Sequence, residues 1–204
     1  MKCSIVDIHT HRPTGKALEP SFAGIHPWQA ETRRIEEIVP RFGEVDLVGE
    51  IGLDYAGTVG REAQLRIFRE QLDWAERLGK PVVLHCVKAF EAVMRELAPH
   101  ALRAVIFHGF IGSSQQAAEA IKKGYYLSFG ERTFRSPRTV EALRRTPVEN
   151  LFAETDESDV PIEEIYRRIA QAKDLDPELL KCAIYRNYRE IFLSLIHISE
   201  PTRP

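Results

Sequence analysis

The stretch "VDLVGEIGLDYAGTVGREAQLRIFREQLDWAERLGKPVVLHC", residues 45–86, sets two short apolar runs on either side of an amphipathic segment. In residues 61–80 the apolar side chains recur every three or four positions, which is the spacing of a helix that buries one face. The flanking runs, 45–53 and 81–86, are continuously apolar, as strands of a parallel sheet are when both faces are covered. The stretch therefore predicts a strand–helix–strand unit.

The same alternation continues along the chain. Helical patterns that begin at serines are expected over 113–124 and 136–147. Such repetition indicates an α/β fold with a parallel sheet, either open and doubly wound or closed into a barrel. No glycine-rich phosphate loop follows any run, which favours the barrel. The strand-like runs are 3–9, 21–26, 45–53, 81–86, 103–110, 124–130 and 150–156.

Composition describes an ordinary globular protein. With 204 residues, 44% of them hydrophobic, the chain suits one domain with a sizeable core. A net charge of -2 gives no global basic field for nucleic acid, although a local basic groove stays open. Cys3, Cys86 and Cys182 are scattered and odd in number, so we expect reduced thiols in a cytoplasmic protein. No secretory segment or bilayer-spanning run of ~20 apolar residues is present, so no membrane association is expected.

Imidazole and carboxylate side chains stand near the C-terminal ends of five of these runs. In a parallel barrel all such ends meet at one mouth, and buried charged groups there are costly unless paired or bound to metal. Imidazoles mixed with carboxylates suit zinc, manganese or iron, and six ligands suffice for two ions. The sequence therefore predicts a metal site built from His9, His11, Glu50, His85, His108 and Asp156.

In this order, seven motifs resemble the TatD-type metal-dependent hydrolases. The resemblance covers residues 3–193, and 187–192 resembles the closing helix of the family; we expect residues 1–193 to form a single domain. It implies a deformed (β/α) barrel of the amidohydrolase-like group, many of whose members are divalent-metal-dependent deoxyribonucleases. The motifs are "DIHTHR" (7–12), "GIHPW" (24–28), "GEIGLDY" (49–55), "PVVLHC" (81–86), "FHGFIG" (107–112), "YLSFG" (126–130) and "ETDES" (154–158).

The resemblance also implies roles for the six side chains. Two divalent ions (Mg, Mn or Zn) would bind there, one held by His9, His11 and Asp156 and the other by His85 and His108. Glu50 would lie between the ions as a structural bridge. Asp156 is the expected catalytic residue that orients or deprotonates the attacking water, with Glu50 as the second member of the catalytic pair.

The chain departs from the family pattern near its start. Residues 12–22, eleven in all, separate the histidine pair from the "GIHPW" strand, which is too short for a helix and an extra strand. We therefore predict a seven-stranded, incompletely closed barrel that lacks one helix–strand unit and has an open mouth. The family arginine two residues after His85 is Val87 here.

Substrate contacts are predicted from position alone. Arg132 and Arg135 follow the sixth strand-like run and could clamp phosphates, together with Arg138, while a solvated basic turn is the alternative. His26 is either a substrate contact or a turn residue before proline. The expected substrate is DNA or another phosphodiester, and no obligate protein partner is evident.

Three functions remain open at this stage. The first is a metal-dependent phosphodiesterase acting on DNA. The second is an amidohydrolase or esterase that uses the same metals on a carbonyl, because both reactions need similar polarisation. The third is a non-catalytic metal-binding barrel. Residues 194–204 resemble a translated adaptor sequence, so we expect a non-native, disordered tail without a role for His197.

Overall fold

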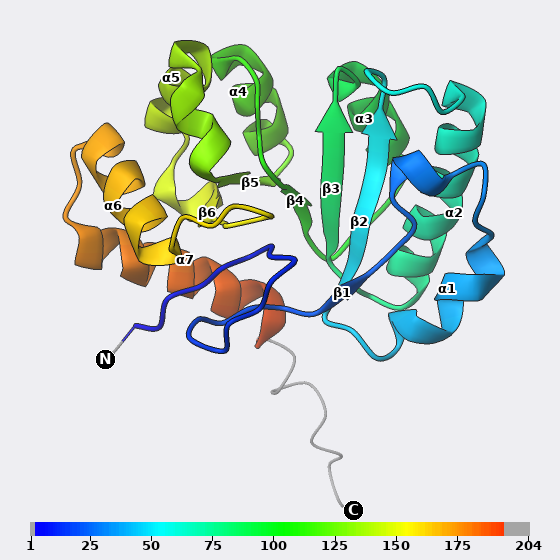
Figure 1. Ribbon diagram of the computed structural model, residues 1–204, viewed down its shortest axis with the longest axis horizontal. Coiled ribbons are helices and arrows are strands. Elements are labelled where there is room, and N and C mark those ends of the chain that lie inside the picture. Colours follow the sequence, from blue (N-terminus) through cyan, green and yellow to red (C-terminus); the bar gives the residue numbers. More distant parts are fainter. Residues whose placement is uncertain (1–2, 194–204) are drawn as a thin grey trace, which may run out of the picture.

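Six parallel strands form one sheet in the order β1 to β6, and helices lie around it (Figure 1). This computed structural model describes residues 3–193. Sequence order equals strand order, so every connection steps to the neighbouring strand, as in a (β/α) barrel. The strands are β1 (Phe22–Ala23), β2 (Leu47–Asp54), β3 (Val82–Val87), β4 (Val105–Phe107), β5 (Tyr126–Phe129) and β6 (Leu151–Ala153).

The helices follow the predicted rhythm. The patterns over 61–80, 113–124 and 136–147 are confirmed as helices, and Ser113 and Ser136 accept hydrogen bonds from the backbones of their first turns. The helices are α1 (Ile35–Phe42), α2 (Arg61–Arg77), α3 (Phe90–Leu97), α4 (Ser114–Lys122), α5 (Pro137–Arg145), α6 (Ile162–Lys173) and α7 (Pro177–Phe192), with 3-10 turns η1 (Pro27–Gln29), η2 (Glu131–Arg135) and η3 (Val148–Asn150).

The N-terminal run lies between β6 and the segment that leads into β1. Its backbone forms isolated parallel bridges, Val6 with Leu18 and Thr10 with Asp156. The prediction of seven strands is therefore corrected to six, because this run pairs at separate points and not along a continuous ladder. The expected absence of a helix from residues 12–22 is confirmed. The sheet is an incomplete barrel.

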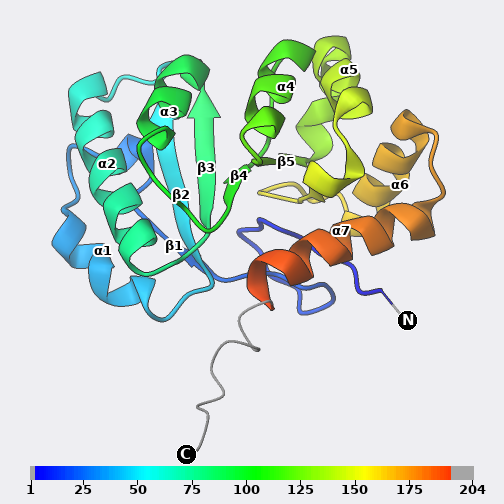
Figure 2. The ribbon, with the colours of Figure 1, turned by 180° about the vertical axis from the view of Figure 1, so that it is seen from behind.

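Side chains and a disulfide anchor the same run. The Tyr166 hydroxyl of α6 donates to Val6 O and accepts the Val6 N–H. Cys3 is joined to Cys182 of α7 in a disulfide, so the prediction of reduced thiols is wrong for these two residues, while Cys86 is free. The sequence separation hides this pairing, because only the fold brings the run beside α7 (Figure 2).

Strand β2 is buried along its whole length and is irregular at its centre. Its register with β3 shifts between Val48 and Ile51, and Glu50 lies within this shift. Irregularities of this kind re-aim side chains and are common beside active sites. Gly52 follows with φ +142°, and a Cβ there would lie 2.0 Å from His85 O, so only glycine fits.

Two further predictions concern membranes and the tail. Within residues 3–193, every helix is too short or too polar to cross a membrane. The expectation of a disordered tail over 194–204 falls outside the described residues.

Candidate metal centre

The six predicted side chains converge on one mouth of the sheet, with the Glu50 carboxylate at the centre. Glu50 Oε1 is 2.6 Å from both His85 Nδ1 and His108 Nε2. The other oxygen, Oε2, lies 3.5 Å from His9 Nε2 and 3.4 Å from His11 Nε2. The two oxygens of one buried carboxylate therefore face two separate pairs of imidazoles.

Asp156 completes the group around the first histidine pair. Its Oδ1 is 3.7 Å from His11 Nε2 and 3.9 Å from His9 Nε2. The Asp156 backbone has φ +56°, a left-handed conformation that non-glycine residues rarely adopt. Two hydrogen bonds hold it there, because Asp156 N–H donates to His9 O and Asp156 O accepts the His11 N–H. Such strain persists only where the surroundings over-determine the conformation.

His26 faces the centre directly. Its Nε2 lies 3.5 Å from Glu50 Oε1, on the same side as His85. Its Nδ1 accepts the backbone N–H of Trp28, which fixes the orientation of the ring. The position of His26 thus matches a ligand-type side chain as well as the predicted substrate contact.

Two acidic residues at the site were missed by the sequence reasoning. Glu154 Oε1 lies 3.3 Å from His108 Nδ1, and Asp54 Oδ2 lies 3.2 Å from His85 Nε2. A signal for Glu154 was present, since residues two apart on a strand share a face and Glu154 precedes Asp156 by two. Asp54 is the last residue of β2, and the register shift earlier in this strand breaks the simple alternation that would have placed it on the face of Glu50.

The electrostatics of the centre are those of a tightly coupled acid–base cluster. Burial alone would raise the pKa of Glu50, but hydrogen bonds from His108, His11 and other imidazoles lower it below its ordinary value. Burial alone would lower the pKa of His108, yet the charge of Glu154 and the hydrogen bonds of the two carboxylates raise it well above its ordinary value. Glu50 is therefore ionised.

The donor set fits divalent cations. The His9 ring is fully buried, and neither of its nitrogens has a hydrogen-bond partner among the described residues. A buried polar group without a hydrogen-bond partner indicates that a water or an ion binds there. Within residues 3–193, four groups of three ligand-type residues have their ligand atoms within 4.8 Å of one another, and they include all six predicted residues, His26 and Glu154.

The predicted arginines border the centre unequally. Arg132 is exposed and lines two cavities that both reach Asp156, and it has no hydrogen bond or ion pair within the described part of the chain. Arg135 lines one of these cavities, but its guanidinium is paired with Glu131 at 2.7 Å. Arg132 is thus the arginine placed to meet a ligand.

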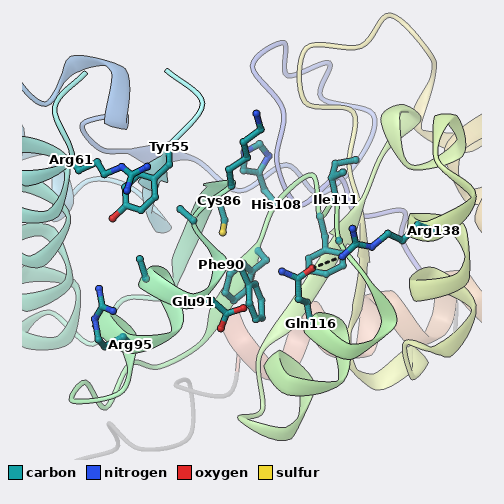
Figure 3. Close-up of a pocket in the computed structure, with 16 residues that line it drawn as sticks. Tyr55, Arg61, Cys86, Phe90, Glu91, Arg95, His108, Ile111, Gln116 and Arg138 are labelled. Carbon is teal, nitrogen blue, oxygen red and sulfur yellow. Dashed lines mark hydrogen bonds between the residues drawn. The ribbon is translucent and has the colours of Figure 1, made fainter. Parts of the chain in front are cut away.

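Another cavity, of about 620 Å³, adjoins the centre through His108 (Figure 3). Arg61 lies over the Tyr55 ring at one side of this cavity, and Arg138 contacts Gln116 at the other. Arginines therefore stand on both sides of the space beside His108.

A barrel of parallel strands with imidazoles and carboxylates at its carboxyl-end mouth is the architecture of metal-dependent hydrolases. The chain belongs to the family of TatD related DNases, whose model matches residues 16–193.

Individual proteins to which the chain is similar carry TatD or metal-dependent hydrolase names. The chain is 33% identical over 157 residues to "Uncharacterized metal-dependent hydrolase YjjV" of Escherichia coli (strain K12), covering 71% of this chain and 61% of the relative. It is 30% identical over 202 residues to "3'-5' ssDNA/RNA exonuclease TatD" of Citrobacter rodentium, covering 84% and 76%. The crystal structure of the TatD homolog YjjV from Escherichia coli shares the fold, with a TM-score of 0.77, 24% identity and coverage of 88% of this chain and 78% of that one. The chain spans only 50% to 61% of the length of the first curated relatives it matches.

Proposed function

We propose that this chain is a divalent-metal-dependent phosphodiesterase that hydrolyses DNA. The observation that carries the proposal is the single Glu50 carboxylate, whose two oxygens face two pairs of histidines. One pair contains His9, whose ring nitrogens have no hydrogen-bond partner among the described residues. A nucleic-acid substrate is supported by the relative from Citrobacter rodentium, which is named as an exonuclease for single-stranded DNA and RNA.

The proposed ligands follow the two faces of Glu50. His9, His11 and Asp156 would hold one ion, and His85 and His108 would hold a second, with Glu50 between the two groups; Mg, Mn and Zn all suit this donor set. Divalent cations bound here would supply positive charge beside a phosphoryl oxygen and lower the pKa of the water that attacks the phosphorus atom.

The chain's own residues supply orientation and proton transfer. Asp156 has one fifth of its side chain exposed and His11 somewhat more, whereas Glu50 and His9 are buried, so water reaches the cluster on the side of Asp156 and His11. The Asp156 carboxylate orients the attacking water and accepts its proton. Glu50 stays ionised and fixes the spacing of the histidines.

The surroundings suit a polyanion. Arg132 lies at the edge of two cavities beside Asp156 and has no hydrogen bond or ion pair among the described residues. Arg61, Arg95 and Arg138 line the neighbouring cavity, where Glu91 is the acidic residue (Figure 3). Guanidinium groups bind phosphate oxygens in a bidentate manner, so these side chains can hold the backbone on either side of the scissile bond.

The experiment follows cleavage of single-stranded DNA by the chelator-treated protein after Mg²⁺ or Mn²⁺ is added, with bound metal measured by elemental analysis. Glu50→Gln and Asp156→Asn should abolish cleavage and reduce bound metal. The matched control is Glu96→Gln, since Glu96 on α3 is as buried as Glu50 but pairs with Arg69 of α2. It should keep its activity.

Three results would contradict the proposal. Near-wild-type cleavage by Glu50→Gln would refute the assigned ligand set. Metal-stimulated hydrolysis of ester or amide substrates, with DNA left intact, would establish a carbonyl hydrolase instead. Bound metal without hydrolysis of any of these substrates would establish a non-catalytic metal-binding barrel.

A further inference from the structure

Trp28 is the most conspicuous exposed aromatic side chain at the mouth. Within residues 3–193, it has 62% of its surface exposed, whereas the other tryptophan, Trp74, is half-buried on α2. A single exposed apolar ring is common on protein surfaces, so the position of Trp28 and the way its ring is held decide what it can do. Trp28 lines the same cavity, of about 450 Å³, as Glu50 and Asp156.

The indole ring is fixed in orientation although it is exposed. Its Nε1–H donates to Asp54 Oδ2 at 2.7 Å, and Asp54 is itself buried. The His26 ring packs edge-on against it, with the centroids 4.6 Å apart. A ring held in this way loses little conformational entropy when a flat ligand stacks on it.

The cavity carries charges of both signs. Glu50, Asp156 and Glu157 line it, the first two being proposed metal ligands, and its two arginines are placed to hold an anionic group of a flat ligand. Arg132 and Arg41 line the cavity together with Trp28, and both are exposed without a side-chain partner among the described residues. Aromatic rings stack on nucleobases whatever the base, while arginines hold the connecting phosphates.

We propose that Trp28 is a stacking platform for the unpaired nucleobase of the nucleotide next to the bond that is cleaved. The proposal rests on the proposed function and adds a base site to it. A base within a duplex has both faces stacked and cannot reach the ring, so Trp28 selects single strands.

The test uses the two tryptophans of the chain as reporters. Trp74→Phe leaves Trp28 as the sole tryptophan, and Trp28→Phe leaves Trp74. Both variants are titrated with short oligothymidylate and oligouridylate in the presence of chelator, so that no cleavage occurs. Fluorescence should be quenched to saturation in Trp74→Phe and stay unchanged in Trp28→Phe.

Affinity, measured by the anisotropy of a labelled oligonucleotide, separates stacking from the hydrogen bond to Asp54. Trp28→Ala should weaken binding about 10-fold, because a stacked base is lost. Trp28→Phe should keep most of the affinity, since it retains a ring and loses only the N–H donor. Equal losses in the two variants would overturn the proposal, and so would binding of the oligonucleotide without quenching in Trp74→Phe.

The outcome is independent of hydrolysis. If the wild-type protein cleaves DNA but Trp74→Phe shows no quenching of Trp28, only the proposed base site is refuted. If Trp28 is quenched but the wild-type protein does not cleave DNA with metal, the phosphodiesterase function is refuted and a binding site for single-stranded nucleic acid remains. A protein that does neither overturns both.

Discussion

Asp7 holds Thr155 by two hydrogen bonds that join the N-terminal run to the segment after β6. One carboxylate oxygen accepts the Thr155 backbone N–H at 2.9 Å, and the other accepts its hydroxyl at 2.6 Å. Asp7 is buried beside the histidine pair, and Thr155 directly precedes Asp156. The pair therefore holds the histidine pair of the N-terminal run and Asp156 after β6 around one cluster.

Replacement of Asp7 by asparagine should lower metal affinity about 10-fold, because an amide cannot accept both hydrogen bonds and loss of a supporting contact commonly costs this much. Isothermal titration with Mn²⁺ measures the effect. The control is Asp46→Asn, since Asp46, just before β2, also accepts a backbone N–H and a hydroxyl, both from Ser21 and both at its Oδ2. A similar loss of affinity in Asp46→Asn would show a general effect on folding.

Asp54 orients His85 from the side opposite Glu50. Asp54→Asn should reduce metal affinity about 10-fold, because the amide no longer holds the imidazole as a carboxylate does. Asp54 also accepts the Trp28 indole N–H, so Trp28→Phe serves as the control that removes this second contact alone. Equal metal affinities of Asp54→Asn and the wild type would refute the positioning role.

The disulfide between Cys3 and Cys182 should contribute about 2 to 4 kcal/mol to the free energy of unfolding, because it restricts the unfolded chain over a long loop. Urea unfolding with and without dithiothreitol measures this contribution. In Cys3→Ser the reductant should have no further effect. A wild-type protein that unfolds identically with and without reductant would show that the bond does not stabilise the fold.

Gly52→Ala should destabilise the protein by about 2 kcal/mol or more, because the new Cβ would meet His85 O in a backbone conformation that disfavours side chains. Gly43→Ala is the control, since a Cβ there meets nothing within 4 Å and the backbone has φ -70°. Urea midpoints compare the two, and equal midpoints would contradict the account of β2.

Much of the fold could be predicted from local patterns. The helix over 61–80 follows from apolar spacing, and the convergence of Glu50 with His85 follows from the parallel direction of their strands. The roles of these residues as metal ligands remain predictions.

Other features depend on tertiary geometry that no local pattern carries. The aim of Glu50 depends on a register shift within β2, and the contact of Asp54 with His85 depends on the pairing of β2 with β3 beyond this shift. The pairing of Cys3 with Cys182 depends on where α7 lies. Sequence spacing fixes none of these, because each is decided by elements that meet only after folding.

The placement of the N-terminal run has a consequence for the order of assembly. His9 and His11 are synthesised well before the elements that hold their segment, because Asp7 contacts Thr155, 148 residues later, and Cys3 bonds to Cys182, 179 residues later. The segment therefore cannot make these contacts until β6 and α7 have been synthesised, and the cluster around Glu50 is completed only then.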